Sequence, residues 1–110
     1  MPEPEQELVL DRLIHEPSRL AILTVLASVR DADFLFLLRA TGLTKGNLSS
    51  HLAKLEDAGL IAIEKRFIRK KPNTNVALTD TGRDRIGRHW QQLDHLRRRA
   101  EAAQPEAASR

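Results

Sequence analysis

The stretch from Gly42 to Leu60 constrains the fold of this chain most, because it holds both the start and the stop signals of a helix. Gly42 can adopt the left-handed conformation that ends a preceding helix. Thr44 is a good N-cap, since its hydroxyl can accept a hydrogen bond from a free amide of the first turn. Gly59 supplies the C-terminal stop. The sequence therefore predicts a capped helix over residues 44–58, placed one tight turn after another helix.

This predicted helix has two different faces. Leu48, Leu52 and Leu55 recur at helical spacing and form one apolar stripe. The opposite face carries short hydrogen-bonding groups and cations, namely Gly46, Asn47, Ser50 and Lys54, with Ser49 and His51 on its flanks. It has no acid before Glu56, so it can approach a base edge or a phosphate without repulsion. With the preceding helix and the glycine turn it predicts a helix-turn-helix, and an ordinary surface helix of a small bundle is the alternative.

The basic charge of the chain is concentrated after this helix. Residues 1–60 hold 6 Lys and Arg against 9 Asp and Glu, whereas residues 61–110 hold 12 against 6, for a formal net charge of +3. Such an asymmetry is expected if one end of the domain faces a polyanion, although a basic segment can also be solubilising surface.

Length and composition limit the classes of protein to consider. A chain of 110 residues is enough for one domain, which we expect over residues 7–101 between disordered tails at 1–6 and 102–110. The acidic start lacks the features of a signal peptide, and no apolar run is long enough to cross a bilayer. The absence of cysteine excludes disulfides and thiolate sites. We expect a cytoplasmic protein with no membrane partner.

The remaining segments predict helices around a small hairpin. Before the glycine turn, apolar periodicity predicts helices over residues 7–15 and 17–29, the second apolar nearly all round and hence central, and a third from Asp31 or Asp33 to about Thr41. After Gly59, residues 60–68 and 75–78 have strand character. A last helix begins near Thr79 and runs to about residue 101.

The turn between the two predicted strands carries three consecutive cations, Arg69, Lys70 and Lys71, followed by Pro72 and Asn73, which have turn chemistry. Such a charge run is often only a solvated loop. Its position directly after a helix-turn-helix suits a wing that reaches neighbouring phosphates or the minor groove.

The last helix needs a surface that buries its apolar stripe. The first helix of the same chain can cover part of this stripe, and a second copy of the chain can cover the rest. Trp90 is the natural anchor of such an interface. We expect the dimer interface to contain Val9, Leu10, Leu13, Ile86, Trp90, Leu93 and Leu96.

In this order of elements the chain resembles the winged-helix transcriptional regulators of bacteria and archaea, in particular the MarR-like and ArsR-like groups. The resemblance rests on the Gly-Leu-Thr-x-Gly-Asn-Leu-Ser-x-His-Leu pattern of residues 42–52 and on a second match over residues 71–83. It implies a mainly α fold with a small β-hairpin (α+β), in the order of four helices, of which the fourth is the recognition helix, then a two-stranded wing and a last helix.

The resemblance also implies a homodimer whose recognition helices enter successive major grooves of double-stranded DNA. The positions that match DNA contacts of the family are Thr44, Lys45, Asn47, Ser49, Ser50, His51 and Lys54 on the helix, and Arg69, Lys70, Lys71, Asn73 and Thr74 on the wing. We expect Asn47 and Ser50 to face base edges and the other helix positions to hold phosphates.

Catalysis and metal binding fit the sequence less well. Ser50 and His51 are adjacent on a helix and point in different directions, so they do not form a nucleophilic triad. His89 and His95 lie six residues apart, whereas chelation from one helix prefers three or four. A metal site between subunits, with Asp94 or His15, is the remaining alternative. We therefore expect no enzyme activity, no metal and no cofactor.

The expected function is sequence-specific regulation of transcription, most simply as a homodimeric repressor. Other uses of the same fold are a protein–protein interaction module and a sensor that responds to a metal or a small-molecule effector. RNA is a poorer partner, because its major groove is too narrow for a helix. An aromatic content of 4% also leaves few platforms on which single-stranded bases can stack.

Overall fold

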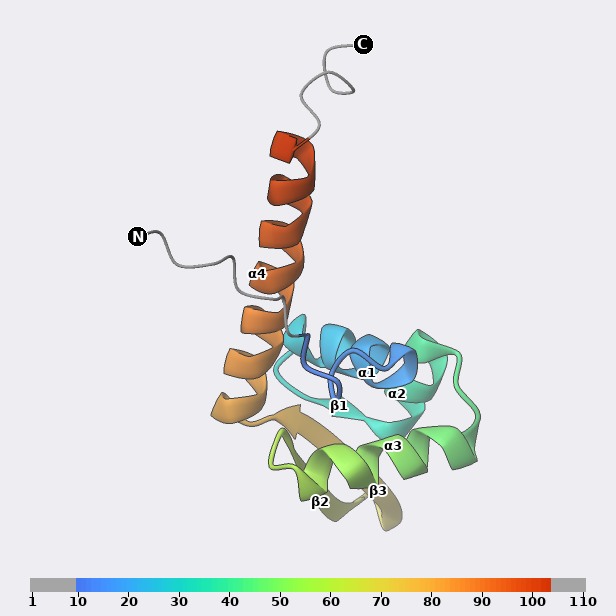
Figure 1. The fold of residues 1–110 in the computed structure, drawn as a ribbon. Helices are drawn as coiled ribbons and strands as arrows, with labels where there is room; N and C mark the ends of the chain where they lie inside the picture. The colour runs from blue at the N-terminus through green and yellow to red at the C-terminus, as the bar shows by residue number, and fades with distance from the viewer. Residues whose placement is uncertain (1–9, 104–110) are drawn as a thin grey trace.

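The computed structural model describes residues 10–103, which form four helices and a three-stranded antiparallel sheet (Figure 1). The elements in chain order are α1 (Pro17–Ala27), β1 (Ala32–Asp33), α2 (Phe34–Thr41), α3 (Lys45–Asp57), β2 (Ile61–Ile68), β3 (Lys71–Leu78) and α4 (Asp80–Ala103). The sheet order is β1-β3-β2. The predicted α+β winged fold is confirmed, but the helix predicted as the fourth, the recognition helix, is the third, α3, and the sheet has three strands rather than two. The tail predicted over residues 1–6, and residues 104–110 of the other tail, lie outside the described residues, and α4 continues through residues 102 and 103.

Helix α1 is the centre of the core, as its apolar composition predicts. It contacts α2, α3, α4 and β3, and Ile22, Leu23 and Leu26 are buried. Its start is defined by Pro17 in the first turn and by Glu16, whose carboxylate accepts hydrogen bonds from two free amides of that turn.

The helix predicted over residues 7–15 is wrong for the part that the structure describes. Residues 12–14 form a turn, in which the Asp11 carboxylate accepts hydrogen bonds from the amides of Leu13 and Ile14 at 3.1 and 3.3 Å. Glu16 then has extended backbone, because a residue before proline disfavours the helical region. Ile14 is fully buried, so the turn still contributes to the core. Residues 7–9, including Val9, lie outside the described residues.

Helix α3 begins and ends where its caps predict. Thr44 Oγ1 accepts from the amide of Asn47 at 3.1 Å. Gly42 and Gly59 take the left-handed conformation, with φ of 71° and 76°. Leu48, Leu52 and Leu55 are all buried, which confirms the predicted stripe. Burial of this stripe leaves the polar face of α3 in solvent.

The hairpin is longer and its turn tighter than the sequence indicates. Strands β2 and β3 pair from Ile61↔Leu78 to Ile68↔Lys71, so the connection is only Arg69 and Lys70. Both residues have positive φ, 53° and 67°, a conformation that a two-residue turn normally gives to Asn and Gly. The turn predicted over residues 69–74 is therefore too long. The short strand β1, which pairs with β3, was not predicted, because two residues carry no periodic signal.

The start of α4 is held against the end of α3. Thr79 Oγ1 donates to the Gly59 carbonyl at 2.7 Å and accepts from the Gly82 amide at 3.0 Å, in the capping position predicted for it. A Cβ atom at Gly82 would clash with the backbone carbonyl of Leu60. Close approach of two backbones therefore requires glycine at this position.

Replacement of Gly82 by alanine should lower the free energy of unfolding by about 1–3 kcal/mol, because α4 must move away from Leu60. Gly87→Ala is the matched control on the same helix. A Cβ there meets no atom within 4 Å, so better helix propensity should raise stability by about 0.5–1 kcal/mol. Urea denaturation of both variants measures whether the free energy of unfolding changes with opposite signs. Equal changes would contradict the close approach of the α4 backbone to Leu60.

The double substitution Arg69→Asn with Lys70→Gly should raise the free energy of unfolding by about 1–2 kcal/mol, because it relieves two left-handed residues with bulky side chains. Lys71→Gly removes a cation from the paired strand instead and should not stabilise the chain. Urea denaturation at two salt concentrations separates relief of backbone strain from relief of charge repulsion. A gain that vanishes at high salt would indicate repulsion.

Candidate nucleic-acid interface

The exposed face of α3 carries nearly all the helix residues that the sequence assigns to DNA. Those that are exposed are Thr44, Lys45, Asn47, Ser49, Ser50 and Lys54. Since the leucine stripe lies in the core, the rotation of α3 about its axis is determined by packing. The surface is polar and carries cations, and its acids, Glu56 and Asp57, come only at the C-terminal end.

His51 differs from its neighbours, because its side chain is only 17% exposed. Its Nδ1 atom lies 3.4 Å from a guanidinium nitrogen of Arg19 and 3.7 Å from the Glu16 carboxylate. The guanidinium can only donate, so a hydrogen bond from Arg19 requires Nδ1 to accept and puts the proton of a neutral imidazole on Nε2. His51 thus joins α3 to the start of α1. Sequence reasoning missed Arg19, because nothing local connects residues 32 positions apart.

Glu16 is an acid beside His51, with its carboxylate 3.7 Å from the ring Nδ1. Burial raises the pKa of its carboxyl, but the hydrogen bonds from the amides of Arg19 and Ser18 and the charge of Arg19 outweigh it, so the pKa lies below its usual value. The carboxylate is therefore ionised at neutral pH and balances the adjacent guanidinium.

The hairpin extends from the core with its basic end in solvent. Every residue of β2 from Glu64 to Ile68 is exposed, as are Arg69, Lys70 and Lys71. Asn73 and Thr74 are half-buried, and the Asn73 carbonyl oxygen accepts from Arg66 Nε across the strands at 3.2 Å. Besides the predicted cations Arg69, Lys70 and Lys71, the hairpin thus exposes Lys65 and Arg66 on β2.

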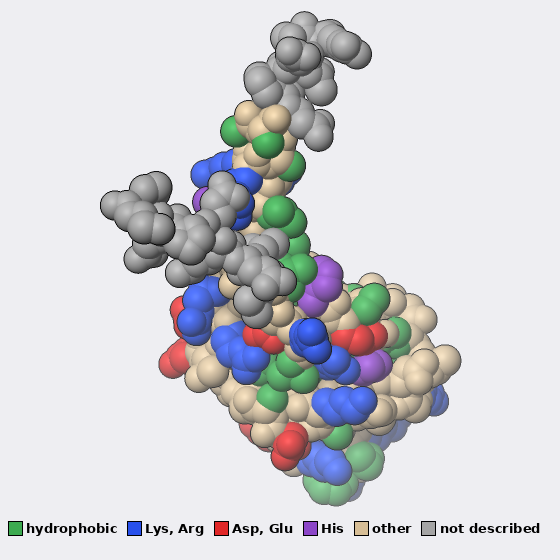
Figure 2. Space-filling model, viewed as in Figure 1, with side chains coloured by type: hydrophobic (Ala, Val, Ile, Leu, Met, Phe, Trp, Pro, Cys, Tyr) green, Lys and Arg blue, Asp and Glu red, His purple; other side chains and the backbone are tan. Residues whose placement is uncertain are grey.

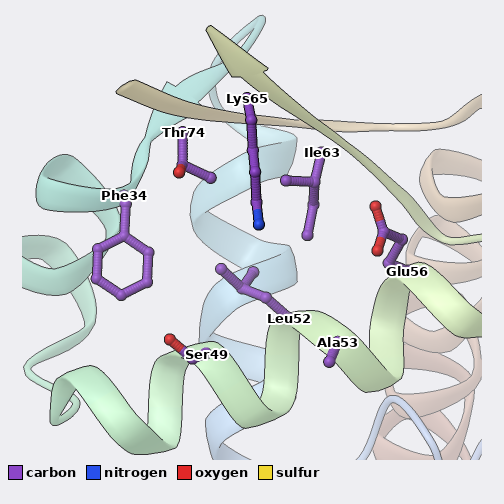
Figure 3. A pocket seen from close by; sticks show the side chains of 8 residues that line it. All are labelled: Phe34, Ser49, Leu52, Ala53, Glu56, Ile63, Lys65 and Thr74. Carbon is purple, nitrogen blue, oxygen red and sulfur yellow. The ribbon is translucent and has the colours of Figure 1, made fainter. Parts of the chain in front are cut away.

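A groove of about 660 Å³ separates α3 from the hairpin (Figure 3). Its apolar floor comes from Phe34, Leu52 and Ile63. Lys65 extends from β2 into the groove toward α3 and ends above Leu52, with Thr74 beside it on β3. Ser49 lines the groove from α3, on the side of Phe34. Glu56 is at the other end of the groove. A cation and two hydroxyls on opposite walls are groups that can hold a backbone phosphate.

Helix α3 and the hairpin lie at the same end of the molecule, and the distal part of α4 points away from it (Figure 1). Figure 2 shows Lys and Arg side chains next to hydrophobic ones at this lower end, over the hairpin. The two segments that the sequence assigned to DNA are therefore brought together by the fold.

The residues expected at a dimer interface have different environments. Trp90 and Leu96 are each 41% exposed, and Leu93, Leu10 and Leu13 are half-buried. Ile86 is 1% exposed and belongs to the core of the subunit, so its side chain has no free surface for a partner. Sequence periodicity placed it on the stripe of α4, but the first turns of that helix cover the chain's own core.

Polar contacts join the N-terminal turn, residues 12–14, and its flanking residues to α4. Arg85 forms an ion pair with Asp11 at 2.7 Å, and His15 Nδ1 lies 3.1 Å from His89 Nε2. Burial raises the pKa of Asp11, but the hydrogen bond and charge of Arg85, with two backbone amides, lower it below its usual value. Burial and the charge of His15 lower the pKa of His89, which is 1% exposed. Both groups therefore favour the folded state at neutral pH over acid pH.

Two observations concern other partners. Within residues 10–103 no cluster of three or more His, Cys, Asp or Glu side chains could hold a metal ion. No helix in that part of the chain is both long and apolar enough to span a membrane.

Comparison with known proteins agrees with this geometry. Residues 18–96 match the winged helix DNA-binding domain family. The protein MJ0432 of Methanocaldococcus jannaschii is 32% identical over 72 residues, which cover 66% of this chain and 78% of the relative. The structure of a transcriptional regulator homologue from Pyrococcus horikoshii OT3 is 34% identical with a TM-score of 0.72, over 76% of this chain and 83% of that one.

More distant structures share the fold alone. A MarR family regulator from Silicibacter pomeroyi superposes with a TM-score of 0.62 at 20% identity, over 81% of this chain and 59% of that one. The family match covers most of the chain and both segments of the candidate interface. The chain therefore belongs to the winged helix DNA-binding domain family.

Proposed function

We propose that this protein is a homodimeric transcriptional regulator that binds double-stranded DNA, with α3 in the major groove and the β2–β3 hairpin on the neighbouring backbone or minor groove. The observation that carries the proposal is that α3 and the hairpin lie at one end of the molecule (Figure 1), where the polar side chains of α3 and the cations of the hairpin are exposed. The Pyrococcus horikoshii relative is described as a transcriptional regulator homologue, which supports the same role.

On α3, side-chain length and exposure suggest which residues contact base edges and which contact phosphates. Asn47 and Ser50 are short, exposed and capable of both donating and accepting, which suits the edges of bases. Lys45 and Lys54 are exposed cations near the two ends of the helix and suit phosphates. Thr44 and Ser49 add hydroxyl donors, and His51 can donate from the ring nitrogen that does not face Arg19.

The groove between α3 and the hairpin suits one strand of the DNA backbone. When a helix enters the major groove, the strand that borders that groove passes beside it. Lys65, Ser49 and Thr74 line the groove from both sides and would hold a phosphate there. Arg69, Lys70 and Lys71 lie farther out on the hairpin and would reach the next phosphates or the minor groove.

The exposed apolar side of α4 supports dimerisation. A helix of 24 residues is about 36 Å long, and its distal part extends away from the core (Figure 1). Trp90, Leu93 and Leu96 lie on one side of it and keep exposed area that a second copy can bury. A dimer would present two α3 helices to half-sites one helical turn apart, and occupation of a promoter by such a dimer would most simply repress transcription.

Salt dependence tests the DNA proposal directly. If about 6 phosphates are contacted per dimer, log affinity should fall with log salt concentration with a slope near −5. Lys70→Ala with Lys71→Ala should weaken binding to all sequences and flatten the slope. With two cations fewer, the protein neutralises fewer phosphates, so binding releases fewer counterions from the DNA. Fluorescence anisotropy with a duplex recovered from a randomised pool measures both, and a flat salt response of the unmodified protein would refute the proposal.

Asn47→Ala is the control for this experiment, because it removes no charge. It should leave the salt slope unchanged and cost about 1–3 kcal/mol at one or two base positions of the recovered site. A uniform loss over all sequences, with a changed slope, would place Asn47 at the backbone instead.

Trp90→Ala should shift the protein toward monomer, because the indole is the largest apolar group left exposed on α4. Sedimentation equilibrium at micromolar concentration measures the shift. Leu35→Ala on α2, where the side chain is 54% exposed, is the matched control and should leave the dimer intact. A monomeric unmodified protein would remove the dimer from the proposal without affecting the DNA-binding face.

A further inference from the structure

The end of the hairpin exposes a large aromatic side chain among cations. Phe67 is 76% exposed, the highest value among the exposed large hydrophobic residues in the described part of the chain, and the adjacent Ile68 is 44% exposed. Five cations lie along the distal hairpin, on β2, in the turn and at the start of β3: Lys65, Arg66, Arg69, Lys70 and Lys71. Figure 2 shows hydrophobic side chains beside Lys and Arg at this lower end of the molecule.

The strand register places Phe67 on the side of the hairpin that faces α3. Side chains alternate along a strand, so Phe67 shares a face with Lys65 and Ile63, which line the groove against α3. Its partner in the register is Pro72, which provides no apolar cover beyond its own ring. Ile68 lies on the opposite face, paired with Lys71. The phenyl ring is therefore presented on the same side as the polar surface of α3.

The positive charge near the Phe67 ring indicates an anionic partner. A second copy of this basic tip would repel it, and so would any other cationic surface. A polyanion with an apolar interior fits both features, since the cations meet phosphates while the ring leaves water. Duplex DNA has this construction, with charged backbones outside and stacked bases inside.

The backbone of the tip supports a role in binding. Arg69 and Lys70 hold left-handed conformations that suit Asn and Gly better, so the tip keeps cations at a cost in stability. Phe67 adds little to stability, because a phenyl ring that is 76% exposed removes little apolar area from water on folding. A strained turn next to an exposed aromatic ring indicates that the tip is shaped for a partner.

We propose that Phe67 is an apolar wedge that enters the minor groove and partly unstacks one base step, so that the duplex is kinked where the hairpin meets it. The proposal rests on the DNA-binding function above and adds a geometry of the bound DNA and a source of specificity. Pyrimidine–purine steps such as TA and CA unstack most easily, so the protein should prefer one of them under the hairpin without contacting the edges of its bases.

The test uses the full chain and duplexes recovered from a randomised 30-bp pool by binding to the unmodified protein. Dyes at the two ends report bending by energy transfer, and 2-aminopurine at the step under the hairpin reports unstacking by its fluorescence. The unmodified protein should bend the duplex by about 20–90° and raise the 2-aminopurine signal. Replacement of that flexible step by a stiff one should lower affinity on the order of tenfold.

Phe67→Ala should abolish the bend and the fluorescence rise while keeping the salt slope, because no cation is lost. Phe67→Leu retains a wedge and should restore much of both signals. Ile68→Ala is the matched control on the other face and should behave like the unmodified protein. Because Phe67 is exposed, its alanine variant should keep the same unfolding midpoint and sedimentation behaviour.

Salt-dependent binding with a straight, stacked duplex would overturn the wedge and leave the proposed function intact. A bend that survives Phe67→Ala, or a loss of dimer in that variant, would also overturn it, since the ring would then serve another contact. Failure of the pool to yield any bound duplex would overturn both.

Discussion

Burial of the leucine stripe of α3 is the interaction on which the candidate interface depends. Leu48, Leu52 and Leu55 are each no more than 3% exposed, and each buried leucine contributes about 1.5–3 kcal/mol. Rotation of α3 by one residue, about 100°, would expose this stripe and bury polar groups without partners. The core therefore determines which side chains of α3 face solvent. A DNA-reading surface needs this rigidity, because base edges are distinguished by the positions of donors and acceptors.

The hairpin differs from α3, because little of its distal half packs against the core. Ile63 and Val76 anchor it, and beyond them the strands hold each other through backbone hydrogen bonds and the side-chain hydrogen bond from Arg66 to Asn73. Its turn keeps two cations in left-handed conformations, and its end exposes Phe67. The left-handed turn lowers the stability of the free chain, and both features suit a polyanionic partner. The molecule thus combines a rigid helix with an extended basic arm, separated by a groove lined by Lys65 and Ser49.

Local signals in the sequence predicted much of this arrangement. The caps and the stripe of residues 44–58 identified α3, because each signal lies within one helix and concerns its own hydrogen bonds. The predicted helix over residues 7–15 failed because apolar spacing alone does not show that Asp11 caps a turn. The length of the hairpin turn failed because Arg and Lys are not the residues that usually take positive φ. In the first case a side-chain cap produced a turn where the spacing predicts a helix. In the second, two residues adopted a backbone conformation that is unusual for their type.

The sequence by itself determined that α3 is amphipathic, that its polar face is free of acids over its first turns, and that cations follow it in a hairpin. Helical period, capping and turn chemistry act between neighbours in the chain, so they can be deduced without a structure. Only the tertiary structure decided that Lys65 and Ser49 line the same groove, that Arg19 and Glu16 meet His51, and that Ile86 lies in the core rather than at a partner's surface. These contacts join segments far apart in the sequence, and they depend on how the helices and the sheet pack together, which no local pattern records.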